Sequence, residues 1–115
     1  MSTPLPVAVI GAGHMGRHHV RLYSGLAGVR LAGVVDTNVE RARALAEPLG
    51  VPFGEVLTPQ IGDVAAVSVA VPTVHHLAVA RPLIERRIGV LIEKPLAPSL
   101  AEAREIADLA RRHDT

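Results

Sequence analysis

Short apolar runs alternate with amphipathic stretches along the whole chain. The apolar runs predict buried strands at 7–10, 29–35, 51–53, 65–71 and 89–92. Between them, apolar residues recur at helical spacing over about 14–26, 37–49, 74–86 and 99–112. Alternating strands and helices indicate parallel βαβ units, and right-handed crossovers place such helices on both faces of one sheet. We therefore expect an α/β fold with a doubly wound parallel sheet of about five strands.

Several local signals refine these boundaries. Thr37-x-x-Glu40 and Ser99-x-x-Glu102 both have the form of a capping box, so a helix is expected to begin at each. The proline in 51–53 predicts an edge strand, because proline cannot donate a hydrogen bond within a sheet.

The first predicted strand runs directly into Gly11-Ala12-Gly13-His14-Met15-Gly16, a Gly-x-Gly-x-x-Gly turn that opens a helix. In this motif Gly11 allows the sharp turn, Gly13 makes room for a pyrophosphate, and Gly16 lets the helix pack closely on the strand. The unpaired N–H groups of the first helical turn, at His14 and Met15, would face the phosphates. This context predicts a dinucleotide site in a Rossmann-type sheet of order 3-2-1-4-5, against the alternative of a merely structural turn.

An acidic residue stands where the second strand should end. Asp36 lies twenty positions beyond Gly16, which suits a carboxylate that binds the hydroxyls of the adenosine ribose. The same carboxylate would repel a 2′-phosphate, so we expect NAD rather than NADP, although Arg41 could partly compensate. Thr37 is counted with Asp36 among the cofactor-binding residues.

Bulk properties exclude several classes of protein. At 115 residues the chain is expected to be one dinucleotide-binding domain spanning 1–115. No membrane-length apolar run or signal peptide is visible, and the absence of cysteine fits a cytoplasmic protein without a thiolate metal site. Acidic and basic residues are interspersed with a net charge of +1, unlike a nucleic-acid binder. Adjacent histidines such as His18 and His19 point apart on a helix, so no metal site is expected.

Three segments should meet at the carboxyl edge of the sheet: the glycine turn, Pro72-Thr73 with the two histidines that follow, and Glu93-Lys94-Pro95. Lys94 is the only lysine among twelve basic residues. An ammonium there could stabilise a developing alkoxide or relay its proton, whereas the alternative is a surface lysine in an arginine-rich chain. Glu93 is either a polar contact to the nicotinamide ribose or amide, or a partner that fixes Lys94.

The glycine turn, Val71-Pro72-Thr73-Val74-His75-His76 and Glu93-Lys94-Pro95 resemble the N-terminal half of the glucose–fructose oxidoreductase, inositol dehydrogenase and rhizopine-catabolism (Gfo/Idh/MocA) family. The resemblance covers essentially all 115 residues, and the interval of seventeen from His76 to Glu93 is the family's usual one. It implies oxidation or reduction, dependent on NAD(P), at a carbon of a sugar, cyclitol or nucleotide sugar. It also implies that Asp36 holds the ribose, that Pro72 and Thr73 border the cofactor, and that His76, Glu93 and Lys94 lie near the nicotinamide.

The chain departs from this family in three respects. Thr73 replaces a common asparagine, and Arg87 stands where a glycine usually ends the helix, so that turn is expected to differ. The family's C-terminal substrate domain is absent from these 115 residues. We therefore expect little turnover from the chain alone and self-association through an uncovered sheet edge, and a nucleotide-binding or regulatory module without turnover remains the alternative.

Overall fold

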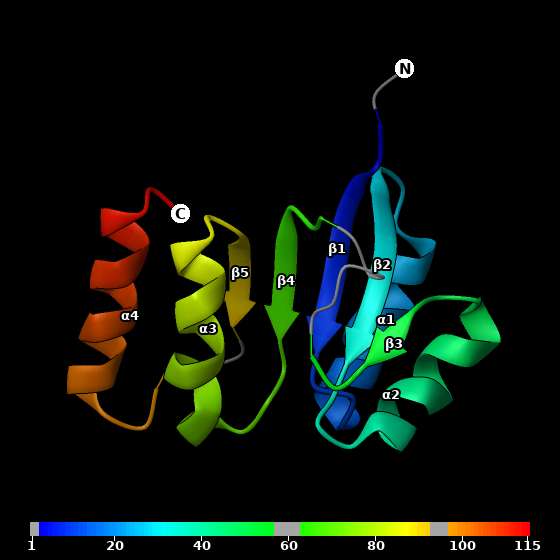
Figure 1. Cartoon of the computed structure of the whole chain (residues 1–115), viewed down its shortest axis with the longest axis horizontal. Coiled ribbons are helices and arrows are strands. Elements are labelled where there is room, and N and C mark those ends of the chain that lie inside the picture. The colour runs from blue at the N-terminus through cyan, green and yellow to red at the C-terminus, as the bar shows by residue number, and fades with distance from the viewer. Residues whose placement is uncertain (1–2, 57–62, 93–96) are drawn as a thin grey trace.

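Five parallel strands form one sheet in the order β3-β2-β1-β4-β5, which confirms the predicted order. The structure is a computed structural model that describes residues 3–56, 63–92 and 97–115 (Figure 1). The strands are β1 Leu5–Ile10, β2 Val29–Val35, β3 Phe53–Gly54, β4 Ala66–Val69 and β5 Gly89–Ile92. The helices are α1 His14–Gly25, α2 Val39–Ala46, α3 His76–Glu85 and α4 Leu100–Arg112, with 3-10 turns η1 Glu47–Leu49 and η2 Thr73–His75.

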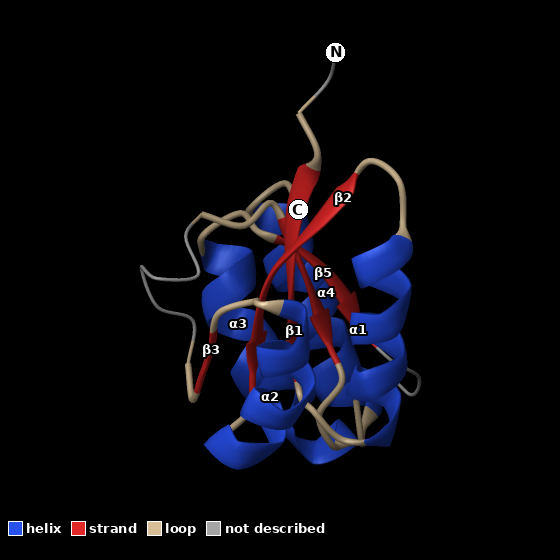
Figure 2. Cartoon of the chain, turned by 90° about the vertical axis from the view of Figure 1, so that its right-hand side faces the viewer, coloured by secondary structure: helices blue, strands red, loops and turns tan. Residues whose placement is uncertain are grey.

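Helices cover both faces of the sheet. Neighbouring residues of each strand point to opposite faces, and each face carries its own apolar cluster. Val9 packs with residues of α1 and α2 on one face, whereas the adjacent Ala8 packs with residues of α3 on the other. Figure 2 shows α1 and α3 on opposite sides of the strands. A third apolar cluster joins α3 to α4 through Ile84 and Ile106. Residues 7–9 of β1, 31–35 of β2 and 67–69 of β4 are buried on both faces, as expected for the centre of a parallel sheet.

The carboxyl ends of four strands lie in register. Ile10 pairs with both Val35 and Val69, and Val69 pairs with Ile92. These ends form the lower edge of the sheet in Figure 1. The chain leaves β1 toward one side and β4 toward the other, so a ligand crevice is expected at this edge, between the two strands.

The two predicted capping boxes have different outcomes. The hydroxyl of Ser99 accepts a hydrogen bond from the N–H of Glu102 at 3.2 Å, which confirms the cap of α4. The box at Thr37 is wrong, because α2 begins after Asn38 and its N-cap has no side-chain hydrogen bond. The carboxylate of Asp36 instead accepts a bond from the N–H of Asn38 at 2.8 Å, so a turn led by Asp36 directs the chain into α2.

The turn between α3 and β5 uses a left-handed residue that is not glycine. Arg87 has a φ of +59°, a conformation in which the side chain crowds the backbone. Its N–H donates to the carbonyl of Ile84 and the N–H of Ile88 donates to that of Leu83, both at 2.9 Å. This pair of bonds is the Schellman closure of a helix, and the buried Ile88 packs with Leu83 beneath it.

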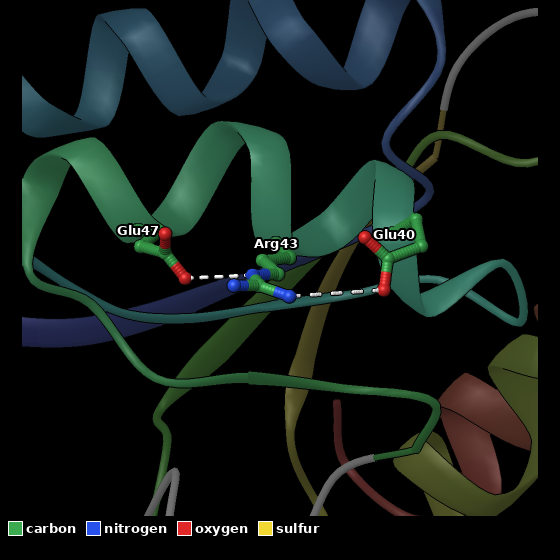
Figure 3. A network of polar contacts seen from close by, with 3 residues as sticks. All are labelled: Glu40, Arg43 and Glu47. Atoms are coloured by element: carbon green, nitrogen blue, oxygen red, sulfur yellow. Dashed lines mark hydrogen bonds and ion pairs between the residues drawn. The ribbon is translucent and has the colours of Figure 1, made fainter.

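The outer face of α2 carries a small ion-pair network (Figure 3). The guanidinium of Arg43 lies 2.7 Å from the carboxylate of Glu47 and 4.0 Å from that of Glu40. The hydrogen bond to Glu47, followed by the negative charges of Glu47 and Glu40, raises the pKa of Arg43 above its usual value. All three side chains are exposed, so the network marks the solvated face of the helix.

No helix within the described ranges has both the length and the apolar character needed to cross a membrane.

At the edge of the sheet, Leu91 of β5 is 56% exposed. Association of two copies through this edge stays a prediction.

Candidate cofactor-binding site

Gly11 makes the turn out of β1 under tight steric limits. Its N–H donates to the carbonyl of Val35 at 2.7 Å, which ties the turn to the end of β2. Its φ is +104°, and a Cβ at this position would lie 2.4 Å from the carbonyl oxygen of Ala70. Any side chain here would strain the backbone and displace the segment that follows β4, so the turn requires glycine.

The other two glycines of the motif have opposite surroundings. A Cβ at Gly16 would lie 1.6 Å from the carbonyl oxygen of Gly11, so α1 packs directly on the turn that precedes it. A Cβ at Gly13 would meet no atom within 4 Å. The space beside Gly13 is open, as the site of a bound pyrophosphate must be.

The N-terminus of α1 opens onto this space. Gly13 is its N-cap and has no side chain to cap it, and the first turn contains no acidic residue. The first N–H groups of a helix have no acceptor within the helix, and the helix dipole adds positive potential there. His14 and Met15 are exposed in this turn. The arrangement therefore suits an anionic group held by backbone N–H donors.

Asp36 connects the glycine turn to the start of α2. One carboxylate oxygen accepts a hydrogen bond from the N–H of Ala12 at 2.7 Å, and the other accepts one from Asn38 at 2.8 Å. Each oxygen has a second lone pair with which it can accept a hydroxyl. The sequence predicted Asp36 as a ribose ligand but not its bond to Ala12, which the pairing of β1 with β2 creates. Thr37 lies exposed beside it.

The segment after β4 forms the neighbouring part of the same edge. Pro72 is exposed and Thr73 is half-buried at the start of η2. His76 begins α3 and is only 1% exposed, so its ring lies within the protein rather than on the rim. Its Nε2 lies 3.0 Å from the carbonyl oxygen of Val71. The preceding histidine, His75, is exposed.

Two predicted residues have no described position. Glu93 and Lys94 lie outside the described residues, which resume at 97 after β5 ends at Ile92. Their roles stay predictions. Among the residues that the structure does describe, no group of three or more His, Cys, Asp or Glu could hold a metal ion.

A polar pair that the sequence analysis missed lies between α1 and β4. The hydroxyls of Tyr23 and Ser68 are 2.5 Å apart, and Ser68 is 1% exposed. Ser68 interrupts an apolar strand, and that interruption was the only signal of a buried partner. The bond satisfies a hydroxyl that would otherwise be buried unpaired, and it fixes α1 against the strand.

Comparison with known proteins identifies this arrangement. The family model described as "Oxidoreductase family, NAD-binding Rossmann fold" (GFO_IDH_MocA) matches residues 5–115. The UDP-N-acetylglucosamine 3-dehydrogenase of Acidithiobacillus ferrooxidans is 38% identical over 106 residues, covering 91% of this chain and 33% of the relative. The inositol 2-dehydrogenase of Pseudarthrobacter chlorophenolicus is 38% identical over 114 residues, covering 94% and 33%.

Solved structures agree with these relatives. GenD2 from gentamicin A biosynthesis, solved in complex with NAD, is 33% identical with a TM-score of 0.91 over 100% of this chain and 34% of its own. GnnA, the UDP-N-acetylglucosamine 3-dehydrogenase from Acidithiobacillus ferrooxidans, is 34% identical with a TM-score of 0.88, covering 98% and 37%. The chain spans about a third of the length of the relatives that it matches.

Proposed function

Because the chain belongs to the Gfo/Idh/MocA oxidoreductase family and forms its NAD-binding Rossmann domain, we propose that it holds the cofactor of a dehydrogenase. The reaction is hydride transfer between the nicotinamide and an alcohol carbon of a sugar, cyclitol or nucleotide sugar. Relatives that act on inositol and on UDP-N-acetylglucosamine support this range of substrates.

The pyrophosphate binds at the glycine turn. The open space beside Gly13 admits it, and the backbone N–H groups of His14, Met15 and Gly16 at the start of α1 surround the negative charge. Gly11 and Gly16 contribute by shape, since their close contacts bring the turn and the helix start together.

Asp36 and Thr37 bind the adenosine ribose and favour NAD. Two N–H donors already orient the carboxylate of Asp36, so it binds the ribose hydroxyls without reorganising. A 2′-phosphate would bring a second negative charge to the same place. Arg41 is exposed on α2 and is the nearest candidate in sequence to offset that repulsion.

The nicotinamide lies toward the segments that follow β4 and β5, bordered by Pro72, Thr73 and Glu93, while the buried His76 lies behind Pro72 and Thr73. When bound, the cofactor accepts or supplies the hydride. Lys94 then either stabilises the developing alkoxide as a compact ammonium charge or, as a neutral amine, takes up the proton that the alcohol loses. An arginine could not relay that proton.

The observation that carries the proposal is the two hydrogen bonds that hold Asp36 beside an open glycine turn. Calorimetric titration of the chain with NADH and NADPH tests it. We expect NADH to bind more tightly than NADPH. Equal affinities, or tighter binding of NADPH, would contradict the role of Asp36, and no binding of either would contradict the proposed function.

The alternative function is a nucleotide-binding or regulatory module without turnover, and activity measurements on a longer polypeptide distinguish it from the proposed one. A dehydrogenase must hold the alcohol carbon about 3–3.5 Å from the reacting ring carbon, and Lys94 cannot orient a sugar by itself. We therefore expect NADH binding but no appreciable NADH formation by these 115 residues with inositols, hexoses or nucleotide sugars. If a longer polypeptide with this domain binds NADH yet turns over none of these alcohols, the regulatory alternative is favoured.

A further inference from the structure

The imidazole of His76 lies inside the protein and contacts the segment after β4, which we propose to border the cofactor. At 1% exposure it is among the largest fully buried side chains of the described residues. Its Nε2 is 3.0 Å from the carbonyl oxygen of Val71. A carbonyl oxygen can only accept a hydrogen bond. Nε2 therefore carries a hydrogen and donates a hydrogen bond to the carbonyl of Val71.

The carbonyl of Val71 lies just beyond the last hydrogen bond between β4 and β1. Just before it, the N–H of Ala70 donates to Ile10 at 2.8 Å, beyond the last residue of β4. Just after it, Pro72 has no N–H, and its carbonyl accepts from His75 at 2.9 Å. The side chain of His76 therefore holds Val71 by a hydrogen bond, between the strand bond at Ala70 and the start of η2.

The same segment lies against the glycine turn. The space that a Cβ would take at Gly11 is 2.4 Å from the carbonyl oxygen of Ala70 and 3.2 Å from the nitrogen of Val71. A shift of Val71 would change both this contact and the direction in which Pro72 and Thr73 leave the strand.

We propose that His76 is a positioning residue for the nicotinamide half of the cofactor, and that it acts through Val71 rather than by touching the cofactor. Its N–H fixes the Val71 carbonyl, which in turn fixes the Pro72–Thr73 wall beside the glycine turn. This inference rests on the proposed function. The adenosine half depends less on His76, because Gly11 and Ala12 have their own bonds to Val35 and Asp36.

The test compares three variants in the full chain by titration with NADH and with ADP. His76→Leu keeps an apolar side chain of similar size but removes the donor, and we expect NADH affinity to fall about tenfold. His76→Gln places an amide N–H near the position of Nε2 and should stay within about threefold of the unchanged protein. His75→Leu is the matched control at the adjacent exposed position and should have no effect.

ADP separates positioning from general damage, since it lacks the nicotinamide half. Its affinity should change less than about twofold in every variant, a pattern that loss of folded protein could not produce. The proposal is overturned if His76→Leu binds NADH normally, if His76→Gln loses as much as His76→Leu, or if ADP weakens in parallel with NADH. Should His76→Leu fail to fold, His76→Gln still decides, because a folded glutamine variant with tenfold weaker NADH binding contradicts the proposal. Failure of the unchanged chain to bind either nucleotide would instead overturn the proposed function.

Discussion

The carboxylate of Asp36 accepts a 2.7 Å hydrogen bond from the backbone N–H of Ala12, a residue 24 positions earlier in the chain. One side chain thus holds the glycine turn and, through Asn38, the start of α2. Asp36, which we propose to bind the ribose, therefore also orients the glycine turn where the pyrophosphate is proposed to bind.

Asp36→Asn should therefore damage more than one contact. The amide retains one acceptor oxygen, and its NH₂ group would face the N–H of Ala12 or Asn38, where two donors cannot bond. We expect NADH affinity to fall by about tenfold or more, with a smaller change for NADPH, because bonds to a charged acceptor are the stronger ones. Calorimetry measures both. Asp63→Asn, at an exposed carboxylate before β4, is the control, and equal losses in the two variants would contradict the assignment.

Gly13 and Gly16 should separate binding from folding. Gly13→Val adds a side chain to open space at a φ of −81°, so the melting temperature should stay within about 2 °C while cofactor binding is abolished. Gly16→Ala should lower the melting temperature strongly, because its Cβ would collide with the carbonyl of Gly11. Thermal unfolding followed by circular dichroism, together with NADH titration, distinguishes the two. A folded Gly13→Val variant that still binds NADH would remove the basis of the proposed pyrophosphate site.

Arg87→Gly should stabilise the protein. Glycine adopts a φ of +59° without crowding, although it also gains freedom in the unfolded chain. The difference should raise the free energy of unfolding by about 0.5–1 kcal/mol, measured by urea denaturation. Arg86→Gly is the matched control, since Arg86 has a φ of −90° and glycine there should destabilise. A gain from both substitutions would show that the backbone conformation at 87 is not the cause.

The two capping sequences should respond differently to alanine. Ser99→Ala removes the hydroxyl that accepts from Glu102 and should lower the free energy of unfolding by about 1 kcal/mol. Thr37→Ala should lower it by less than about 0.5 kcal/mol, because the N-cap of α2 is Asn38 and has no side-chain bond. Urea denaturation compares them directly. A larger loss at Thr37 than at Ser99 would be inconsistent with the cap geometry described above.

Lys94 should affect turnover more than cofactor affinity in a polypeptide that contains this domain and is active. Lys94→Met removes the charge that stabilises the alkoxide, and kcat should fall by about 10²-fold or more while the Kd for NADH changes little. Lys94→Arg should restore little of the rate, because arginine does not relay a proton. Full activity in Lys94→Arg would indicate that only the positive charge matters.

Much of the fold and part of the site were determined by features that act within a few residues. The alternation of apolar runs with helical stretches predicted a parallel sheet, and together with the Gly11–Gly16 motif it predicted the order of the strands. Ser99 capped its helix as predicted, since a cap depends only on residues within one turn.

Tertiary structure decided which groups meet. The pairing of β1 with β2 brings the N–H of Ala12 to Asp36, and no pattern in the sequence specifies that bond. The chain path after β4 likewise turns His76 inward toward Val71, although its place in the sequence suggested the rim. Local preferences choose the elements, but a hydrogen bond between distant residues exists only once the sheet has set their distance and direction.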